Sequence, residues 1–139
     1  MTMAVLVFSQ NWRNYDNLRI EFQKQNDYLT ALDYAKKSLA AFENQYGQKD
    51  SVYADLLNGL SELYYYTKKY DQAVQYGLKE LEIREITQGI YHPSYIFACE
   101  NLAIIYKKND QLTKAEKYYL KTIQLKEKVF GQDNTEYGM

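Results

Sequence analysis

The sequence has few of the residues that break helices or cross-link chains. Its 139 residues include one cysteine, one proline and six glycines. A single cysteine, Cys99, excludes an internal disulfide and fits a reducing compartment, so we expect a cytoplasmic protein. So little glycine and proline favours long helices joined by few turns, and no segment shows a competing strand pattern.

Long apolar runs and blocks of like charge are also missing. The longest apolar run spans residues 3–8. It is far shorter than the roughly 20 residues that a membrane span needs, and no basic region marks it as a secretory signal. The 17 basic and 18 acidic residues are spread along the chain and give a formal net charge of −1. We therefore expect neither nucleic acid nor a membrane as a partner.

Residues that carry catalysis are scarce. The one histidine, His92, cannot supply a metal cluster, and the following Pro93 marks it as a residue at a helix start. Cys99 falls in an apolar column of a helix, which favours a packing role over a nucleophile. The sequence has no phosphate-binding glycine loop, and we expect no buried carboxylate with a tuned pKa. It therefore predicts no enzyme, no metal site and no cofactor.

In contrast, the chain clearly contains an internal repeat with a step of 42 residues. Several columns of similar residues follow this step in one register, which is not expected by chance. The columns are Gly47, Gly89 and Gly131; Ala31, Ala73 and Ala115; Tyr34, Tyr76 and Tyr118; Leu39, Leu81 and Ile123; Leu18, Leu60 and Leu102; and Phe22, Tyr64 and Tyr106.

Each unit is interpreted as two antiparallel helices, A and B. In helix A, apolar residues at spacings of three and four form one stripe. The three copies of this stripe are Tyr15–Leu18–Phe22, Leu57–Leu60–Tyr64 and Cys99–Leu102–Tyr106. In helix B the stripe runs Tyr70, Ala73, Tyr76, Leu81 and then Leu112, Ala115, Tyr118, Ile123. The alanine is small because helix A crosses helix B closely at that point.

Glycines and capping residues punctuate the repeat. Gly47, Gly89 and Gly131 follow the B helices, where we expect each to adopt a left-handed backbone conformation. Helix-start signals follow them at Asp50–Ser51, His92–Pro93 and 134–136. The resulting helices span about residues 10–25, 27–46, 51–67, 70–88, 93–108 and 111–130.

These columns resemble the tetratricopeptide (TPR) pattern W-x2-L-G-x2-Y followed by A-x3-F, with other residues at the Trp and Gly positions. The longer period is similar to that of the repeats in kinesin light chains and many bacterial regulatory proteins. The signature of that form, N-L-A-x2-Y, A-E-x2-Y and G-x2-H-P, is matched by 101–106, 115–118 and 89–93. The resemblance covers about residues 12–137.

The resemblance implies an all-α fold, an α-solenoid of antiparallel helix pairs with three TPR-like repeats in a right-handed superhelix. We divide the chain into an apolar N-terminal leader (1–9), repeats at 10–50, 51–92 and 93–134, and the truncated start of a further helix (135–139). The resemblance further implies a non-enzymatic scaffold that binds a peptide or protein segment in a concave groove lined by the A helices.

The candidate groove residues are those of the A helices that point away from the packing stripe. They are Asn17, Ile20, Lys24, Asn58, Glu62, Tyr65, Tyr66, Phe97, Asn101, Ile104 and Lys108. Asn17 and Asn101 occupy the column where similar proteins hold a peptide backbone with an asparagine carboxamide. Gly59 interrupts this column in the middle copy. The alternative for these polar positions is solvated surface; Tyr64 is expected in the core, with Tyr65 and Tyr66 at its rim.

Two other functions remain open. The chain is a structural or oligomerising segment if the ends of the array, at apolar residues 4–8 and at 135–139, stack on another copy. It is a regulatory segment if it belongs to a larger protein with an effector domain, such as a kinase, protease or DNA-binding domain.

Overall fold

The computed structural model describes the backbone of residues 3–131 and the side chains of residues 12–131. This part of the chain forms helices and no strand. The helices are α1 (Met3–Lys24), α2 (Tyr28–Tyr46), α3 (Ser51–Tyr66), α4 (Tyr70–Thr87), α5 (Pro93–Lys108) and α6 (Leu112–Phe130). The predicted bounds agree closely except at the start, where residues 3–9 of the expected leader belong to α1. The expected helix start at 135–139 lies outside the described residues.

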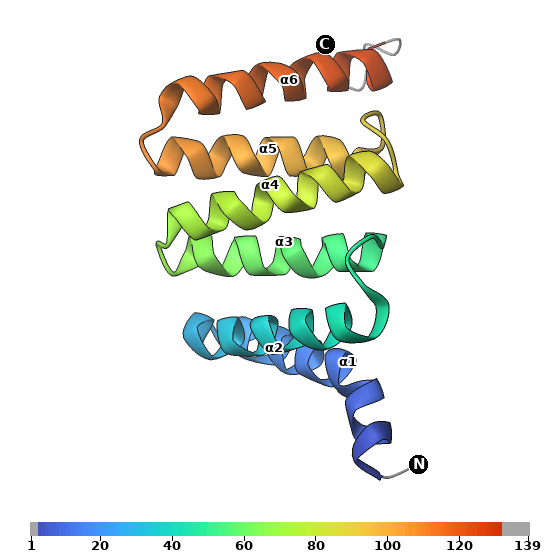
Figure 1. The fold of residues 1–139 in the computed structure, drawn as a ribbon. Helices are drawn as coiled ribbons and strands as arrows, with labels where there is room; N and C mark the ends of the chain where they lie inside the picture. Colours follow the sequence, from blue (N-terminus) through green and yellow to red (C-terminus); the bar gives the residue numbers. More distant parts are fainter. Residues whose placement is uncertain (1–2, 132–139) are drawn as a thin grey trace.

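The helices form a single stack in chain order (Figure 1). Among residues 3–131, each helix packs mainly on the helix before it and the helix after it, so α1 and α6 lie at opposite ends. An array in which each unit contacts only its neighbours is an α-solenoid. The predicted all-α solenoid of antiparallel helix pairs is confirmed.

The alanine column occupies the same environment in all three units. Ala31 and Ala73 are completely buried, and Ala115 is 3 % exposed. The peptide N–H of each donates a 3.0 Å hydrogen bond to the carbonyl of the residue that precedes its helix, Asp27, Lys69 or Gln111. The small residue predicted at the contact of helices A and B is therefore buried at the same place in each repeat.

An aromatic pair joins the two helices of each repeat next to this crossing. The rings are stacked, with nearly equal separations in the three units. The ring centroids are 5.6 Å apart for Phe22 and Tyr34, 5.4 Å for Tyr64 and Tyr76, and 5.6 Å for Tyr106 and Tyr118. Stacked rings add to the free energy gained by burying apolar surface, so the aromatic columns help to fix the helix pair.

The turns between helices A and B also follow the period. The residues Asn26, Lys68 and Asp110 adopt left-handed backbone conformations, with φ of 60°, 63° and 59°. The next residue of each turn donates its N–H to the carbonyl of the aromatic residue of helix A, at 2.8–2.9 Å. This bond, from a residue to one five positions earlier, is the Schellman arrangement that ends a helix sharply.

The turns between repeats follow the prediction in two of three places. Gly47 and Gly89 have the positive φ that the prediction requires, 84° and 89°, in a region that favours glycine. The prediction is wrong at Gly131, which has a φ of −69°. Its N–H still donates to the Glu127 carbonyl in helical fashion, so α6 does not end there in a left-handed residue.

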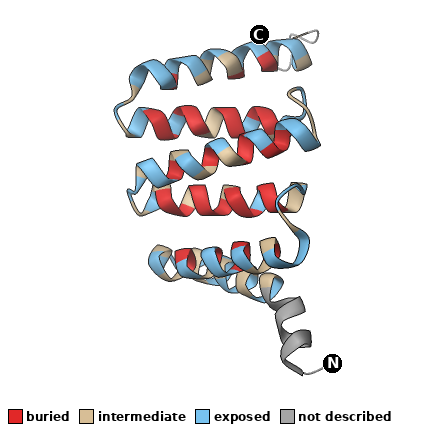
Figure 2. Ribbon diagram, in the orientation of Figure 1, coloured by how far each residue is buried: buried red, intermediate tan, exposed pale blue. Residues whose placement is uncertain are grey.

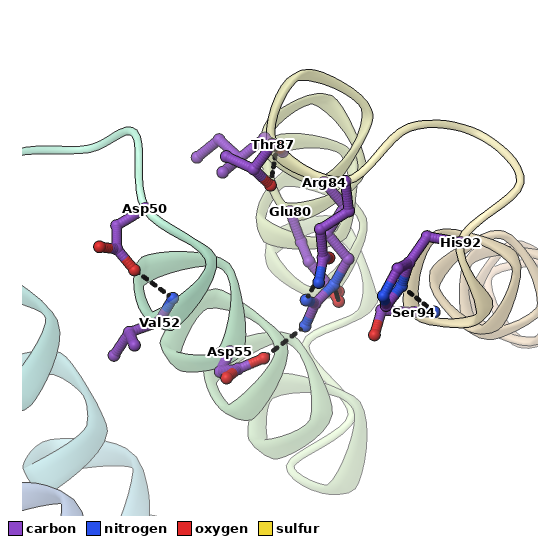
Figure 3. Close-up of polar contacts among 10 residues, drawn as sticks. Asp50, Val52, Asp55, Glu80, Arg84, Thr87, His92 and Ser94 are labelled. Carbon is purple, nitrogen blue, oxygen red and sulfur yellow. Dashed lines mark hydrogen bonds and ion pairs between the residues drawn. The ribbon is translucent and has the colours of Figure 1, made fainter.

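The helix starts use the predicted caps (Figure 3). The Asp50 carboxylate accepts a hydrogen bond of 2.7 Å from the N–H of Val52. The His92 Nδ1 accepts one of 3.1 Å from the N–H of Ser94, and Pro93 begins α5. His92 is therefore a structural residue of the turn, as its position before proline predicts.

The helices α2 to α5 have a helix on both sides and contain most of the buried residues, whereas α6 has only Ala115, Thr122 and Leu125 buried (Figure 2). Three residues predicted on the core stripes are instead exposed: Leu18 by 39 %, Leu112 by 64 % and Ile123 by 58 %. They lie on α1 and α6, each of which packs mainly on one neighbouring helix within the described part. The sequence pattern describes a repeat with neighbours on both sides, and this condition fails at the ends of the stack.

Candidate functional site

A cavity of about 360 Å³ lies between α3 and α5. Its lining residues are Asn58, Ser61, Glu62, Tyr65 and Tyr66 of α3 with Phe97, Asn101, Ile104 and Ile105 of α5. The structure thus brings together most of the candidate groove residues from the second and third repeats. They meet because α3 and α5 are the A helices of successive units and present the same helical face.

The α3 wall of the cavity is aromatic and held by neighbouring rings. Tyr65 and Tyr66 meet edge to face, with ring centroids 5.7 Å apart. Tyr66 also stacks on Tyr28 of α2 at 4.8 Å, and Tyr65 packs against Tyr70 of α4 at 5.8 Å. Because neighbouring helices fix both rings, the wall is formed before any ligand arrives.

The α5 wall exposes large apolar side chains. Phe97 is 63 % exposed and Ile104 is 38 % exposed. With Asn101 they form one stripe at spacings of four and three, opposite the buried side of α5 that carries Cys99 and Leu102. Exposed apolar groups gathered at one hollow are typical of a binding surface.

One wall of the cavity has an acidic side chain. Among the lining residues Glu62 is the one carboxylic acid, and no lysine, arginine or histidine is among them. The Glu62 carboxylate, together with burial, raises the pKa of the neighbouring Tyr66 hydroxyl above its usual range. An acid and two tyrosine rings therefore share one wall of the site.

The hollow continues towards the start of α5. A second cavity of about 260 Å³ shares Asn58 and Phe97 with the first, and Glu80 and Arg84 of α4 contribute to its wall. Arg84 donates from Nε to Glu80, on the same helix α4, at 2.7 Å, and from Nη2 to Asp55 of α3 at 2.9 Å (Figure 3). Two carboxylates thus surround one guanidinium.

This ion pair corrects the expectation that no carboxylate has a tuned pKa. Burial raises the pKa of Glu80 to about 7, although the Arg84 guanidinium opposes the shift. The cluster arises because Arg84 occupies the repeat position of the buried Phe42. A buried guanidinium needs an acidic partner, and Glu80 lies one helical turn earlier. The sequence signal for this ion pair was an arginine at a core position of the repeat, with a glutamate four residues before it.

The candidate residues of α1 lie apart from the main cavity. Ile20 and Lys24 line a separate hollow of about 320 Å³ with Arg19 and Gln23. Gly59, the middle position of the asparagine column, is buried beneath the Arg19 side chain. The candidates Asn17 and Lys108 are both exposed and line none of these three hollows.

Sequence reasoning missed two lining residues, Ser61 and Ile105. Both are buried, and the Ser61 hydroxyl donates to the Ala73 carbonyl at 2.7 Å. They lie at the border between the packing stripe and the groove stripe, where periodicity assigns a residue to the core. No signal in a single sequence shows that such a residue also forms the floor of a hollow.

Residues 12–131 contain no group of three or more His, Cys, Asp and Glu side chains placed to hold a metal ion. No described helix is both long enough and apolar enough to cross a membrane. Cys99 is fully buried, and burial raises the pKa of its thiol, which keeps the reactive thiolate scarce.

Comparison with known families supports the repeat assignment. Models of the tetratricopeptide repeat match residues 20–86 and 98–136. The chain therefore belongs to the tetratricopeptide-repeat family. In fold, its repeats are similar to those of a candidate kinesin light chain. None of the curated proteins with which the chain was compared matches it.

Solved structures share the fold at low sequence identity. BtubC (BKLC) from P. vanneervenii is 24 % identical, with a TM-score of 0.75 over 83 % of this chain and 46 % of that one. The TPR-like repeats of a candidate kinesin light chain from Podosopora anserina are 17 % identical, with a TM-score of 0.76 over 88 % and 58 %. The N-terminal domain of stress-induced protein-1 from C. elegans is 18 % identical, with a TM-score of 0.67 over 85 % and 86 %. The chain spans about half the length of the first two.

Proposed function

We propose that this chain is a non-enzymatic protein-interaction module that holds an extended peptide, or an extended segment of a protein, along α3 and α5. Tetratricopeptide repeats generally bind protein partners, which supports the class of function. The cavity between α3 and α5 is the observation that carries the proposal for this chain. We place the module in the cytoplasm because a single cysteine, which cannot form an internal disulfide, fits a reducing compartment.

The lining of the cavity has both kinds of group that a peptide needs. The carboxamides of Asn58 and Asn101 each offer a donor and an acceptor, which match the N–H and C=O groups of a peptide backbone. Phe97 and Ile104 offer an apolar surface for a side chain. The volume of 360 Å³ lies within the range of about 300–1,000 Å³ that is usual for ligand sites.

The test is a selection of random 12-residue peptides on the protein, followed by affinity measurements by fluorescence anisotropy. Phe97→Ala is expected to weaken binding about ten-fold, and Asn101→Ala about five-fold, because each removes a contact in the cavity. Ile86→Ala is the matched control, since Ile86 is 73 % exposed and lines none of the hollows. Helicity and melting temperature should not change in these variants. Peptides that bind all three variants as tightly as the unmodified protein would contradict the proposal.

An oligomerising role is the second candidate, and α6 favours it. Ile123 and Leu120 of α6 are 58 % and 50 % exposed. Ile123 occupies the repeat position at which Leu39 and Leu81 are each only 7 % exposed. A second copy that covers Ile123 would bury it as neighbouring helices bury Leu39 of α2 and Leu81 of α4.

A further inference from the structure

We propose that the cavity between α3 and α5 binds a cationic side chain, an arginine or lysine of the bound peptide, between aromatic rings and with Glu62 as its counter-ion. This inference rests on the proposed peptide binding and adds the chemistry of the residue that the cavity selects. It places the positive charge of the ligand near Tyr65, Tyr66 and Phe97.

The aromatic lining suits a cation. Tyr65 and Tyr66 are inclined at 71° to each other and form a corner, and Phe97 contributes the third ring from α5. The face of an aromatic ring carries partial negative charge and attracts ammonium and guanidinium groups. A corner of rings offers such faces in more than one direction.

The protein itself uses this pairing repeatedly. Several of its lysines lie over tyrosine rings in residues 12–131, for example Lys36 over Tyr64 at 5.6 Å and Lys37 over Tyr34 at 5.3 Å. Within the same described residues, no lysine or arginine lies over a ring of the cavity. A cation from a partner would therefore meet the ring faces that Tyr28 and Tyr70 leave uncovered, without displacing a basic side chain of the described residues.

The charges around the cavity have the complementary sign. Glu62 lies in its wall, and Asp55 and Glu80 lie beside the adjoining hollow. The positive charge of Arg84 is already shared by two carboxylates. Lys108, one turn beyond Ile104, is exposed and lines neither cavity. Because Arg84 balances Asp55 and Glu80, the Glu62 carboxylate is the charge of the cavity wall with which a cation of the partner would pair.

Other side chains fit the site less well. An acidic residue would meet the Glu62 carboxylate as a like charge. An apolar residue would cover this carboxylate and take water from it without supplying a partner, which is unfavourable. A cation both replaces the lost water and contacts the rings. Arginine suits the site better than lysine because its planar guanidinium stacks on rings and pairs with a carboxylate through two donors.

The experiment uses the same 12-residue peptide library. Among peptides whose binding depends on Phe97, we expect enrichment of arginine or lysine. Changing that basic residue to glutamine should lower the affinity about ten-fold. Glu62→Gln should lower the affinity of the original peptide about five-fold. It should also reduce the difference in affinity between the original peptide and the peptide with glutamine in place of the basic residue. Glu82→Gln removes the same charge from an exposed residue of α4 outside the cavities, so it should leave affinity unchanged.

The outcomes separate the two proposals. The cationic site would be overturned by peptides that bind Phe97→Ala more weakly but bind Glu62→Gln as tightly as the unmodified protein. Selected peptides without enrichment of basic residues would also overturn it. Either result would leave the proposal of groove binding standing. A selection with no Phe97-dependent peptide would count against both. Melting temperatures of the variants show whether a loss of affinity reflects unfolding.

Discussion

At the scale of single residues, charge and packing conflict most at Glu80. Glu80 is 4 % exposed, and its carboxylate contacts Arg84, which is itself buried. Removal from water disfavours the charged carboxylate, whereas the guanidinium favours it. The net result is a pKa raised from 4.5 to about 7. The folded protein therefore holds a proton on Glu80 at pH values where the unfolded chain has lost it.

This difference predicts how stability depends on pH. Between about pH 4.5 and pH 7 the folded state binds more protons at Glu80 than the unfolded state does. The contribution of Glu80 to the free energy of unfolding should therefore fall as pH rises through this window, by up to about 1.4 kcal/mol per pH unit. Glu80→Gln cannot titrate and should flatten the curve.

Urea unfolding at pH 5, 6, 7 and 8 measures the effect as the difference between variant and unmodified protein. Relative to the unmodified protein, the free energy of unfolding of Glu80→Gln should be lower at pH 5 than at pH 8. Glu82→Gln serves as the control because Glu82 is exposed. Parallel pH profiles for Glu80→Gln and the unmodified protein would show that Glu80 titrates at its ordinary pKa.

At the scale of elements, one turn design joins helices A and B in every repeat, yet its key residue varies. Asn26, Lys68 and Asp110 all adopt a left-handed φ. Asparagine and aspartate tolerate this region, but lysine has no local hydrogen bond to offset its cost. The turn in the second repeat is thus formed by the flanking helices rather than favoured by its own residue.

Lys68→Gly should therefore stabilise the protein. A left-handed conformation costs an ordinary residue about 1–2 kcal/mol, and the added flexibility of glycine in the unfolded chain removes about 0.5–1 kcal/mol of the gain. We expect a net increase of up to about 1 kcal/mol in the free energy of unfolding, measured by urea denaturation. Asn26→Gly should gain less. A decrease for Lys68→Gly would mean that its side chain has a stabilising role in the turn.

At the scale of the whole molecule, the open stripe of α6 tests the oligomerising alternative. Pairing through this stripe predicts a mass by light scattering that rises above 16.5 kDa with concentration. Ile123→Lys should restore a 16.5 kDa species, because a lysine is costly to bury at that position. Leu29→Lys, at a residue of α2 that is 67 % exposed, should not. A mass that stays at 16.5 kDa at all concentrations would exclude this alternative.

Much of the architecture could be predicted from residue spacing. The columns of alanine and aromatic residues predict the helix pairs, their crossing and the caps at Asp50 and His92, because each depends on side chains within one or two helical turns or on a strict repeat. The site could be predicted only in part. The sequence identified Glu62, Tyr66 and Phe97 as groove residues. It did not show that Ser61 lines the cavity or that the Arg19 side chain covers Gly59.

The sequence by itself determined the period, the order of the helices and the face that each helix buries, since hydrophobic periodicity and helix capping act locally. Only the tertiary structure decided where the cavity lies, which repeat positions stay exposed on α1 and α6, and how Arg84 is neutralised. These features depend on which side chains from successive repeats meet, and a large or charged side chain in one repeat changes the space and partners left to the next.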